Sequence, residues 1–317
     1  MIRGARRLPR VIWRRSEWAA NGLLGAFESA RGGDRGIPLE HKPLFIIGAP
    51  RSGSTLLYQL LVQRFDVAYI SNLHCRVYGA PALVERLTRR RIAPPTSYAS
   101  SFGGTEGARA PSECGEYWYR FFRRSPQYVP LEDADQAKLR RLRASVRALG
   151  RAGGRPIAFK NLLCSLRLGP IAEALPEALF IVIRRDLVDN ATSLLAARRH
   201  VHGDYSKWWS AEPPEIERLR GLPAHEQVVE QVRRIETLID AERERLGGGR
   251  FLEVRYEELC DDPRATMASI HAFAELRGAS LKRRGDVPER FERRRGTLID
   301  EAVRQRLIAY ARVNPSP

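Results

Sequence analysis

Residues 44–57 have the sequence Leu44-Phe45-Ile46-Ile47-Gly48-Ala49-Pro50-Arg51-Ser52-Gly53-Ser54-Thr55-Leu56-Leu57, and this stretch decides the fold. Its first four residues are apolar, which is typical of a buried parallel strand. The two glycines accept backbone angles that other residues resist, and a helical spacing of leucines begins at Ser54. The unpaired N–H groups and the dipole at the start of that helix favour an anion. The stretch therefore predicts a strand, a tight loop and a helix that together hold a phosphate-like group.

The loop nearly matches the nucleotide-binding motif G-x-x-x-x-G-K-[ST]. Gly48, Gly53 and Thr55 match, but Ser54 stands where the motif has the lysine that contacts the β- and γ-phosphates. Arg51 supplies a cation inside the turn instead. We therefore expect an anionic ligand other than a Mg-triphosphate. The alternative is a strand–turn–helix with a purely structural role.

Composition limits the class of protein and of partner. The 317 residues contain 43% hydrophobic and 29% charged residues, which are globular values for one or two domains. The net charge of +17 and the pI near 10.4 favour anionic partners such as a nucleotide, a sulfated or phosphorylated substrate, a nucleic acid or a membrane surface. We find no recognised nucleic-acid motif and expect no nucleic-acid partner.

The four cysteines predict reduced, mostly buried thiols: Cys75, Cys114, Cys164 and Cys260. Their spacing fits no zinc cluster, so we expect no metal, and reduced thiols are compatible with a cytoplasmic protein. No apolar run approaches the roughly 20 residues that span a bilayer. Residues 1–31 predict a basic amphipathic helix that packs on its own domain or, alternatively, contacts an anionic membrane peripherally. A linker follows, so we place the first boundary after residue 42.

Four further apolar runs, at residues 67–70, 156–159, 179–183 and 251–254, alternate with helical patterns. Such alternation predicts one α/β domain over residues 43–317, with a mostly parallel central sheet and helices on both faces. We expect helical insertions at about 81–150 and 200–246, over the edge where the strands end. Ligands bind at that edge in open α/β sheets.

A second anion site is predicted where the fourth apolar run ends. Arg185 begins the strand-to-helix turn, and Ser193 follows eight residues later on the helix. The arginine fork and the serine hydroxyl can donate hydrogen bonds to one phosphate. Chance supplies this spacing often, so the pair gains weight only together with the first loop.

Three motifs in order carry a family resemblance: the Pro50–Thr55 loop, the Arg185…Ser193 pair, and the stretch Arg255-Tyr256-Glu257-Glu258-Leu259 followed by Asp262-Pro263. Over residues 43–276 the chain resembles the sulfotransferases that use 3′-phosphoadenosine 5′-phosphosulfate (PAPS). The resemblance is closest to the branch of bacterial enzymes and protein-tyrosine sulfotransferases with Pro-Arg-Ser-Gly-Thr-Thr in the loop. It implies a P-loop-type three-layer fold and transfer of a sulfuryl group from PAPS, without a metal, to a hydroxyl or amine acceptor. A small molecule, a lipid or a carbohydrate would serve as the acceptor.

The resemblance assigns residues to the donor nucleotide. The 5′-phosphosulfate would be held by the loop and the first helical turn, namely Arg51, Ser52, Gly53, Ser54, Thr55 and Leu56. Arg185 and Ser193 would hold the 3′-phosphate, and Tyr256 would help to position the nucleotide. The chain departs from the family at Leu187, where proline is usual. It also lacks an evident glycine- and lysine-rich segment near the C-terminus, which leaves part of the adenosine pocket unassigned.

The chemistry needs a cation near the leaving phosphate and a base for the acceptor. Arg51 and the loop N–H groups would stabilise the charge that builds on the bridging oxygen. Lys160, at the end of the third apolar run, is a candidate for neutralising the transferred group. His74 and Glu113 are equal candidates for the general base, with Glu116 as a further choice. Each of these side chains has an alternative structural role, as a loop histidine, a helix-start carboxylate or an ion-pair partner.

Two other functions fit parts of the sequence. A kinase of the P-loop type is disfavoured because Ser54 replaces the lysine. A basic protein that binds nucleic acid or membrane without catalysis fits the net charge alone. Among the tryptophans, Trp208 and Trp209 are candidates for an acceptor pocket, whereas Trp118 fits a core position better.

Overall fold

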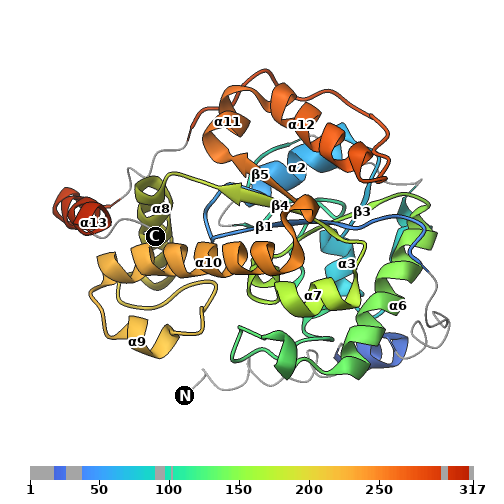
Figure 1. Cartoon of the computed structure of the whole chain (residues 1–317), viewed down its shortest axis with the longest axis horizontal. Helices are drawn as coiled ribbons and strands as arrows, with labels where there is room; N and C mark the ends of the chain where they lie inside the picture. The colour runs from blue at the N-terminus through green and yellow to red at the C-terminus, as the bar shows by residue number, and fades with distance from the viewer. Residues whose placement is uncertain (1–17, 26–37, 90–96, 101–102, 294–298, 314–317) are drawn as a thin grey trace, which may run out of the picture.

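The computed structural model describes residues 18–25, 38–89, 97–100, 103–293 and 299–313. Its centre is a five-stranded sheet in the order β2-β3-β1-β4-β5, and every neighbouring pair is parallel (Figure 1). The strands are β1 (Leu44–Gly48), β2 (Ala68–Tyr69), β3 (Ile157–Lys160), β4 (Leu179–Arg184) and β5 (Phe251–Arg255). They fall on the five apolar runs, so the predicted parallel α/β sheet is confirmed.

The central strand β1 divides the core in two. Its residues are all buried, and successive side chains point to opposite faces of the sheet. Phe45 and Ile47 belong to one hydrophobic cluster, while Leu44 and Ile46 belong to the other. Both faces are therefore covered by apolar side chains, as expected for a three-layer fold.

Helices cover each face. On one side α2 (Ser54–Arg64) and α12 (Pro263–Leu276) pack with Leu44 and Ile46, and α11 (Tyr256–Asp261) contributes Leu259. On the other side lie α6 (Gln136–Gly153), α7 (Leu168–Ala174), α8 (Leu187–His202) and α10 (Ala224–Leu246). Trp118 lies in this second cluster, with its ring centroid 5.9 Å from that of Phe45. Its predicted core position is confirmed.

The remaining elements lie in the connections. Between β2 and β3 are α3 (Asn72–Arg76), α4 (Pro81–Thr88), α5 (Gly115–Trp118) and the 3₁₀ turn η1 (Leu131–Asp133). The turn η2 (Leu162–Leu166) follows β3, and α9 (Ile216–Arg220) and η3 (Gly248–Arg250) precede β5. The helix α13 (Glu301–Val313) packs on α8 and α10. The placement of the insertions at 81–150 and 200–246 and the boundary after residue 42 stay predictions.

Two helices begin later than their apolar patterns suggest. The pattern from residue 131 predicts a helix, but the α-helix begins at Gln136 because Asp135 caps it, accepting hydrogen bonds from the N–H groups of Ala137 (2.8 Å) and Lys138 (3.1 Å). The stretch 113–122 forms only the four-residue helix α5, and the residue before it, Cys114, has a left-handed backbone with φ of 43°. The chain therefore turns sharply just after Glu113.

Of the predicted N-terminal basic helix, only residues 18–25 lie within the described residues, and they are helical. Asn21 Oδ1 accepts a hydrogen bond from the N–H of Gly79 at 2.8 Å, so this segment packs on the chain just before α4. The rest of residues 1–31 and most of the linker lie outside the described residues. In the described part of the chain, no helix combines the length and hydropathy that crossing a membrane requires.

Candidate active site

The loop between β1 and α2 is held tightly against its neighbours. The N–H of Gly48 donates to Ser165 Oγ at 3.0 Å, and that hydroxyl donates back to the Gly48 carbonyl at 3.1 Å. A Cβ atom at position 48 would lie 2.4 Å from the carbonyl oxygen of Ile183 on β4. Only glycine fits such a close approach of two backbones. The loop therefore leaves the sheet at a fixed position.

The two predicted anion-binding groups converge on this loop. Arg51 has a left-handed backbone with φ of 69°, and its Nε donates to Ser193 Oγ on α8 at 3.1 Å. Arg185 Nη1 donates to the carbonyl oxygen of Arg51 at 3.2 Å. Residues from the loop after β1, from the turn after β4 and from α8 thus form one cationic site. The helix α8 begins at Leu187, the position where the resembled sulfotransferases usually have proline. Asp186 caps this helix by accepting a hydrogen bond from the N–H of Asp189 at 2.9 Å.

Tyr256 closes the site from the end of β5. A Cβ atom on Gly53 would lie 2.3 Å from Tyr256 Cδ2, so the ring packs directly on the loop backbone. The guanidinium carbon of Arg185 lies 4.5 Å from the centroid of the same ring. Such cation–π contact restricts both side chains. Tyr256 therefore fixes the positions of the loop and of Arg185 together.

The loop has the polar groups that an anionic ligand needs. The Ser52 hydroxyl has no hydrogen-bond partner among the described residues, but it is fully buried beside Gly48 and is not open to a ligand. The first turn of α2 has no capping side chain and no acidic residue. Its N–H groups and the positive end of the helix dipole are therefore available to an anion. A phosphosulfate fits this donor set.

Lys160 brings a second cation to the loop from β3. Its buried Nζ donates to Thr55 Oγ1 at 3.1 Å and forms an ion pair with Glu113 Oε1. Asn161 Nδ2 donates to the carbonyl oxygen of Glu113 at 3.0 Å, which fixes the backbone of the acid. Glu116 instead pairs with the exposed Arg124 at 2.5 Å. Of the two neighbouring glutamates, the structure brings only Glu113 to the loop.

A cleft with about 870 Å³ of empty space, part of it open to solvent, joins these groups. Its polar lining includes Arg51, Arg185, Ser193, Lys160 and Glu113. Its apolar lining consists of aromatic and leucine side chains, namely Leu56, Tyr98, Leu162, Trp209, Tyr256 and Phe291. Trp209 thus lines the cleft as predicted, whereas Trp208 lies under the guanidinium of Arg198, 4.7 Å from its carbon.

Tyr98, Phe291 and Glu292 also line the cleft, and no sequence motif marks them. The rings of Tyr98 and Phe291 meet edge to face, with their centroids 5.1 Å apart. Both residues come from weakly patterned segments that lie 193 positions apart in the chain. No local sequence signal identifies such a pair, because only the fold brings the segments together.

A model of the sulfotransferase family matches residues 43–279, which is most of the chain. The chain belongs to the sulfotransferase family. It is 26% identical over 254 residues to the omega-hydroxy-beta-dihydromenaquinone-9 sulfotransferase Stf3 of Mycobacterium bovis and of Mycobacterium tuberculosis. The match covers 72% of this chain and 61% of the relatives, so the chain spans about three fifths of their length.

Solved sulfotransferase structures share the fold. The sulfotransferase STF9 from Mycobacterium avium matches with a TM-score of 0.52 and 18% identity, over 89% of this chain and 70% of that one. The sulfotransferase STF1 from Mycobacterium tuberculosis matches with a TM-score of 0.53 and 16% identity, over 84% of this chain and 76% of that one. These likenesses confirm the P-loop-type α/β fold of this family member.

In this sulfotransferase-family chain, His74 lies outside the cleft. Its side chain is fully buried on α3, with Nδ1 2.7 Å from Ser71 Oγ and accepting from the Ser71 N–H at 3.2 Å. Burial, and then the positive charge of Arg109, lowers the pKa of His74 to about 3. An acceptor in the cleft has no access to a buried ring. The geometry therefore leaves Glu113, and not His74, as the candidate base at the loop.

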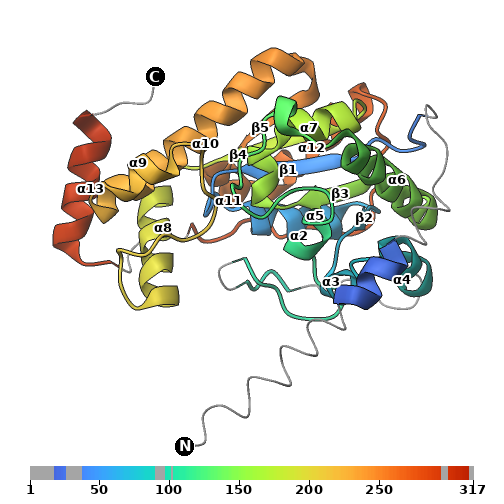
Figure 2. The same ribbon diagram turned by 90° about the horizontal axis from the view of Figure 1, so that it is seen from below.

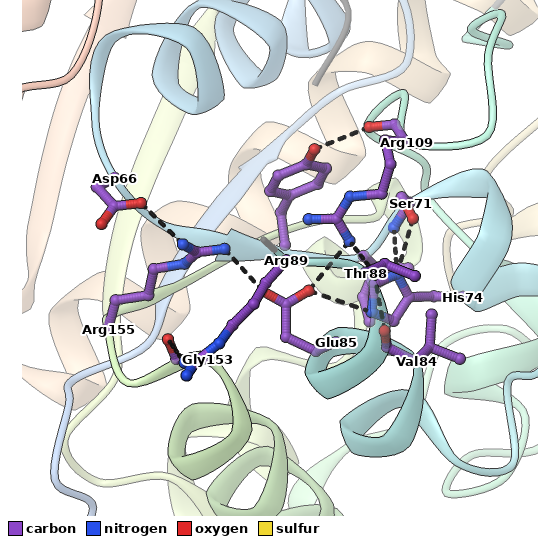
Figure 3. A network of polar contacts seen from close by, with 12 residues as sticks. Asp66, Ser71, His74, Val84, Glu85, Thr88, Arg89, Arg109, Gly153 and Arg155 are labelled. Atoms are coloured by element: carbon purple, nitrogen blue, oxygen red, sulfur yellow. Dashed lines mark hydrogen bonds and ion pairs between the residues drawn. The ribbon is translucent and has the colours of Figure 1, made fainter. Parts of the chain in front are cut away.

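His74 belongs to a buried polar network around Glu85 of α4 (Figure 3). The Glu85 carboxylate accepts from Arg109 at 3.1 Å and from Arg155 at 2.7 Å, and it lies 3.6 Å from His74 Nε2. Arg155 also pairs with Asp66 at 2.9 Å. The network ties the segment that precedes Glu113 to α4 and to the turn before β3. It therefore supports the position of the acid without touching the cleft.

Proposed function

We propose that this family member transfers a sulfuryl group from PAPS to the hydroxyl of an apolar small molecule. The observation that carries the proposal is the convergence of Arg51, Arg185 and Ser193 from three separate segments. A donor with phosphates at both the 5′ and the 3′ positions needs two anion sites next to each other. A nucleoside triphosphate needs one continuous site with a lysine, which Ser54 does not supply.

Donor binding uses the groups described above. The loop N–H groups and the start of α2 bind the 5′-phosphosulfate, while Arg185 and Ser193 bind the 3′-phosphate. Tyr98 and Phe291 line the same cleft and offer aromatic faces on which an adenine would stack. We assign to these two rings the part of the adenosine pocket for which the sequence offers no motif. In the family, PAPS supplies an activated sulfuryl group.

In the reaction, the acceptor oxygen forms a bond to sulfur while the bond from sulfur to the bridging phosphate oxygen breaks. Glu113 takes the acceptor proton. Arg51 and Lys160 stabilise the charge that passes to the leaving phosphate. The buried Lys160 is suited to this role because its ion pair with Glu113 and its hydrogen bond to Thr55 hold its Nζ between acid and loop. The products are the sulfated acceptor and adenosine 3′,5′-bisphosphate.

The lining of the cleft guides the choice of acceptor. Leu162 and Trp209 present apolar surface beside Glu113 and Lys160. The relative Stf3 is named for a hydroxylated menaquinone. Both observations favour a hydroxyl on a lipid-like or aromatic molecule. A sugar stacked on Trp209 is the second candidate acceptor, because indole rings also pack against sugars.

Calorimetric titration with adenosine 3′,5′-bisphosphate tests the donor site. We expect binding that Arg51→Ala and Arg185→Ala each weaken by about 10–100-fold, since each removes charge-assisted hydrogen bonds. Arg264→Ala, at an exposed position on α12, is the matched control and should bind like the parent protein. Folded protein that binds ATP but not the bisphosphate would overturn the proposal in favour of a kinase. Incubation with ³⁵S-labelled PAPS and a panel of lipid alcohols and glycans then identifies the acceptor.

A further inference from the structure

Large apolar side chains are exposed unevenly over the described residues. Seven are exposed, and four of them belong to helix 18–25 and the neighbouring α4: Trp18 (68%), Leu23 (77%), Leu83 (47%) and Leu87 (53%). The other three lie singly on α8, α12 and α13. Isolated exposed apolar residues are ordinary, whereas the concentration of four on two adjoining helices favours an interaction surface in this region. We call these four residues the apolar patch.

The two helices that carry the patch are fixed to each other. Asn21 Oδ1 accepts from the Gly79 N–H, and Asn21 Nδ2 donates to the Arg76 carbonyl oxygen at 3.3 Å. A Cβ atom at Gly79 would lie 2.1 Å from the Asn21 carbonyl oxygen, so the backbones touch two residues before α4 begins. Figure 2 shows helix 18–25 next to α4 at one corner of the molecule. On α4, Leu83 and Leu87 are four residues apart and share one face.

The charges around the patch are positive. Arg86 is exposed between Leu83 and Leu87, and the sequence continues with Arg89, Arg90 and Arg91. The carboxylate on α4, Glu85, points inward and is neutralised by two arginines, and helix 18–25 has no acidic residue. Residues 1–17 contain six arginines and one glutamate. Exposed tryptophan and leucine among arginines suit the headgroup region of a bilayer, where apolar side chains insert and guanidinium groups meet lipid phosphates.

We propose that the apolar patch docks this protein on an anionic lipid bilayer. The positive charge around the patch is complementary to an anionic lipid surface. A second copy of this basic chain would carry the same charge and be repelled. The position of the patch has a consequence for the cleft. Tyr98, Ser100, Gly103 and Glu113 line the cleft, and they belong to the segment that follows α4. We therefore expect the cleft to receive its acceptor from the bilayer, where a lipid alcohol is concentrated.

Vesicle sedimentation with the full chain tests the proposal. The vesicles are phosphatidylcholine alone or phosphatidylcholine with phosphatidylglycerol, each at low and at high salt. We expect binding to the anionic vesicles only, weakened by salt because the charges at the surface are screened. The double variant Leu83→Ser/Leu87→Ser and the variant Trp18→Ser should each weaken it by about tenfold or more, since they remove inserted apolar area.

Leu276→Ser is the matched control, because Leu276 is 80% exposed on α12, away from the patch. It should leave vesicle binding unchanged. An equal loss in Leu276→Ser, or vesicle binding that survives both patch variants, would overturn the proposal. So would light scattering that shows a dimer, with the double variant monomeric and no vesicle binding by the parent protein. Because the patch lies outside the donor site, the patch variants should still bind adenosine 3′,5′-bisphosphate normally, so the two proposals can fail separately.

Discussion

Replacing Gly53 with alanine tests whether Tyr256 and Arg185 form one unit with the donor loop. The new Cβ atom would lie 2.3 Å from Tyr256 Cδ2, whereas ordinary contact begins near 3.4 Å. The ring therefore has to retreat by about 1 Å, because close-packed side chains have no spare room to absorb the clash. Alanine at φ of 93° also adds backbone strain of about 1–2 kcal/mol.

The expected loss follows from the contact that the ring makes. Moving Tyr256 disturbs the cation–π contact that holds Arg185 over it, which is worth about 0.5–2 kcal/mol. At about 1.4 kcal/mol for each factor of ten, affinity for adenosine 3′,5′-bisphosphate should fall by roughly 2–30-fold. Calorimetric titration measures the affinity, and urea denaturation measures the stability of the same samples.

Gly203→Ala separates the clash from the backbone strain. Gly203 has a similar left-handed backbone, with φ of 83°, but a Cβ atom there meets nothing within 4 Å. Gly203 lies at the C-terminal end of α8, far from Ser193. Gly203→Ala should therefore lower stability without changing affinity for the bisphosphate. If Gly53→Ala binds the bisphosphate as tightly as the parent protein, Tyr256 does not position Arg185 and the reasoning fails.

Three further predictions follow from the site and from the buried network. Glu113→Gln should lower kcat by about 10²–10⁴-fold with little change in bisphosphate binding. Glu116→Gln, at the residue that pairs with Arg124, should leave kcat and bisphosphate binding nearly unchanged. Steady-state kinetics with labelled PAPS distinguishes the two variants. Arg109→Met should lower the free energy of unfolding by about 3–5 kcal/mol, because Glu85 stays buried with one cation fewer; a loss below 1 kcal/mol in urea denaturation would contradict this. The pKa of His74 is lowered to about 3 while an unfolded histidine titrates near 6.5, so the unfolded state binds the extra proton between these values. This contribution to stability is complete above about pH 6.5 and falls by about 1.4 kcal/mol per pH unit below it; denaturation from pH 4 to 8 should show a shallower slope in His74→Asn.

The sheet could be predicted from the sequence because its strands are continuous apolar runs. A strand buried on both faces has to be apolar throughout, and residues 44–47 and 179–183 satisfy this locally. The proximity of the two arginines proposed to bind the donor could be predicted for a related reason. Parallel strands end at one edge, so Arg51 and Arg185 had to lie near each other once β1 and β4 were recognised.

The general base could not be predicted in this way, because His74 and Glu113 have equally plausible local contexts. The tertiary structure distinguishes the two residues. Ser71 and Glu85 enclose His74 below the surface, while the left-handed turn at Cys114 leaves Glu113 facing Lys160. Local patterns carry no information on which side of a short helix becomes covered. Pairs such as Tyr98 and Phe291 escape prediction for the same physical reason.

The departure at Ser54 is explained by the neighbouring strand. A nucleotide-binding loop with lysine at this position carries its own cation, whereas here the loop offers a buried serine. Lys160 brings an ammonium group from β3 to within 3.1 Å of Thr55 Oγ1, the hydroxyl next in the sequence. The pairing of Ile46 with Lys160 in the sheet fixes that approach. A cation delivered from β3 lies between the loop and Glu113, where in the proposed reaction it would contact both the transferred group and the base. A lysine on the loop itself would have no such ion pair built into the sheet.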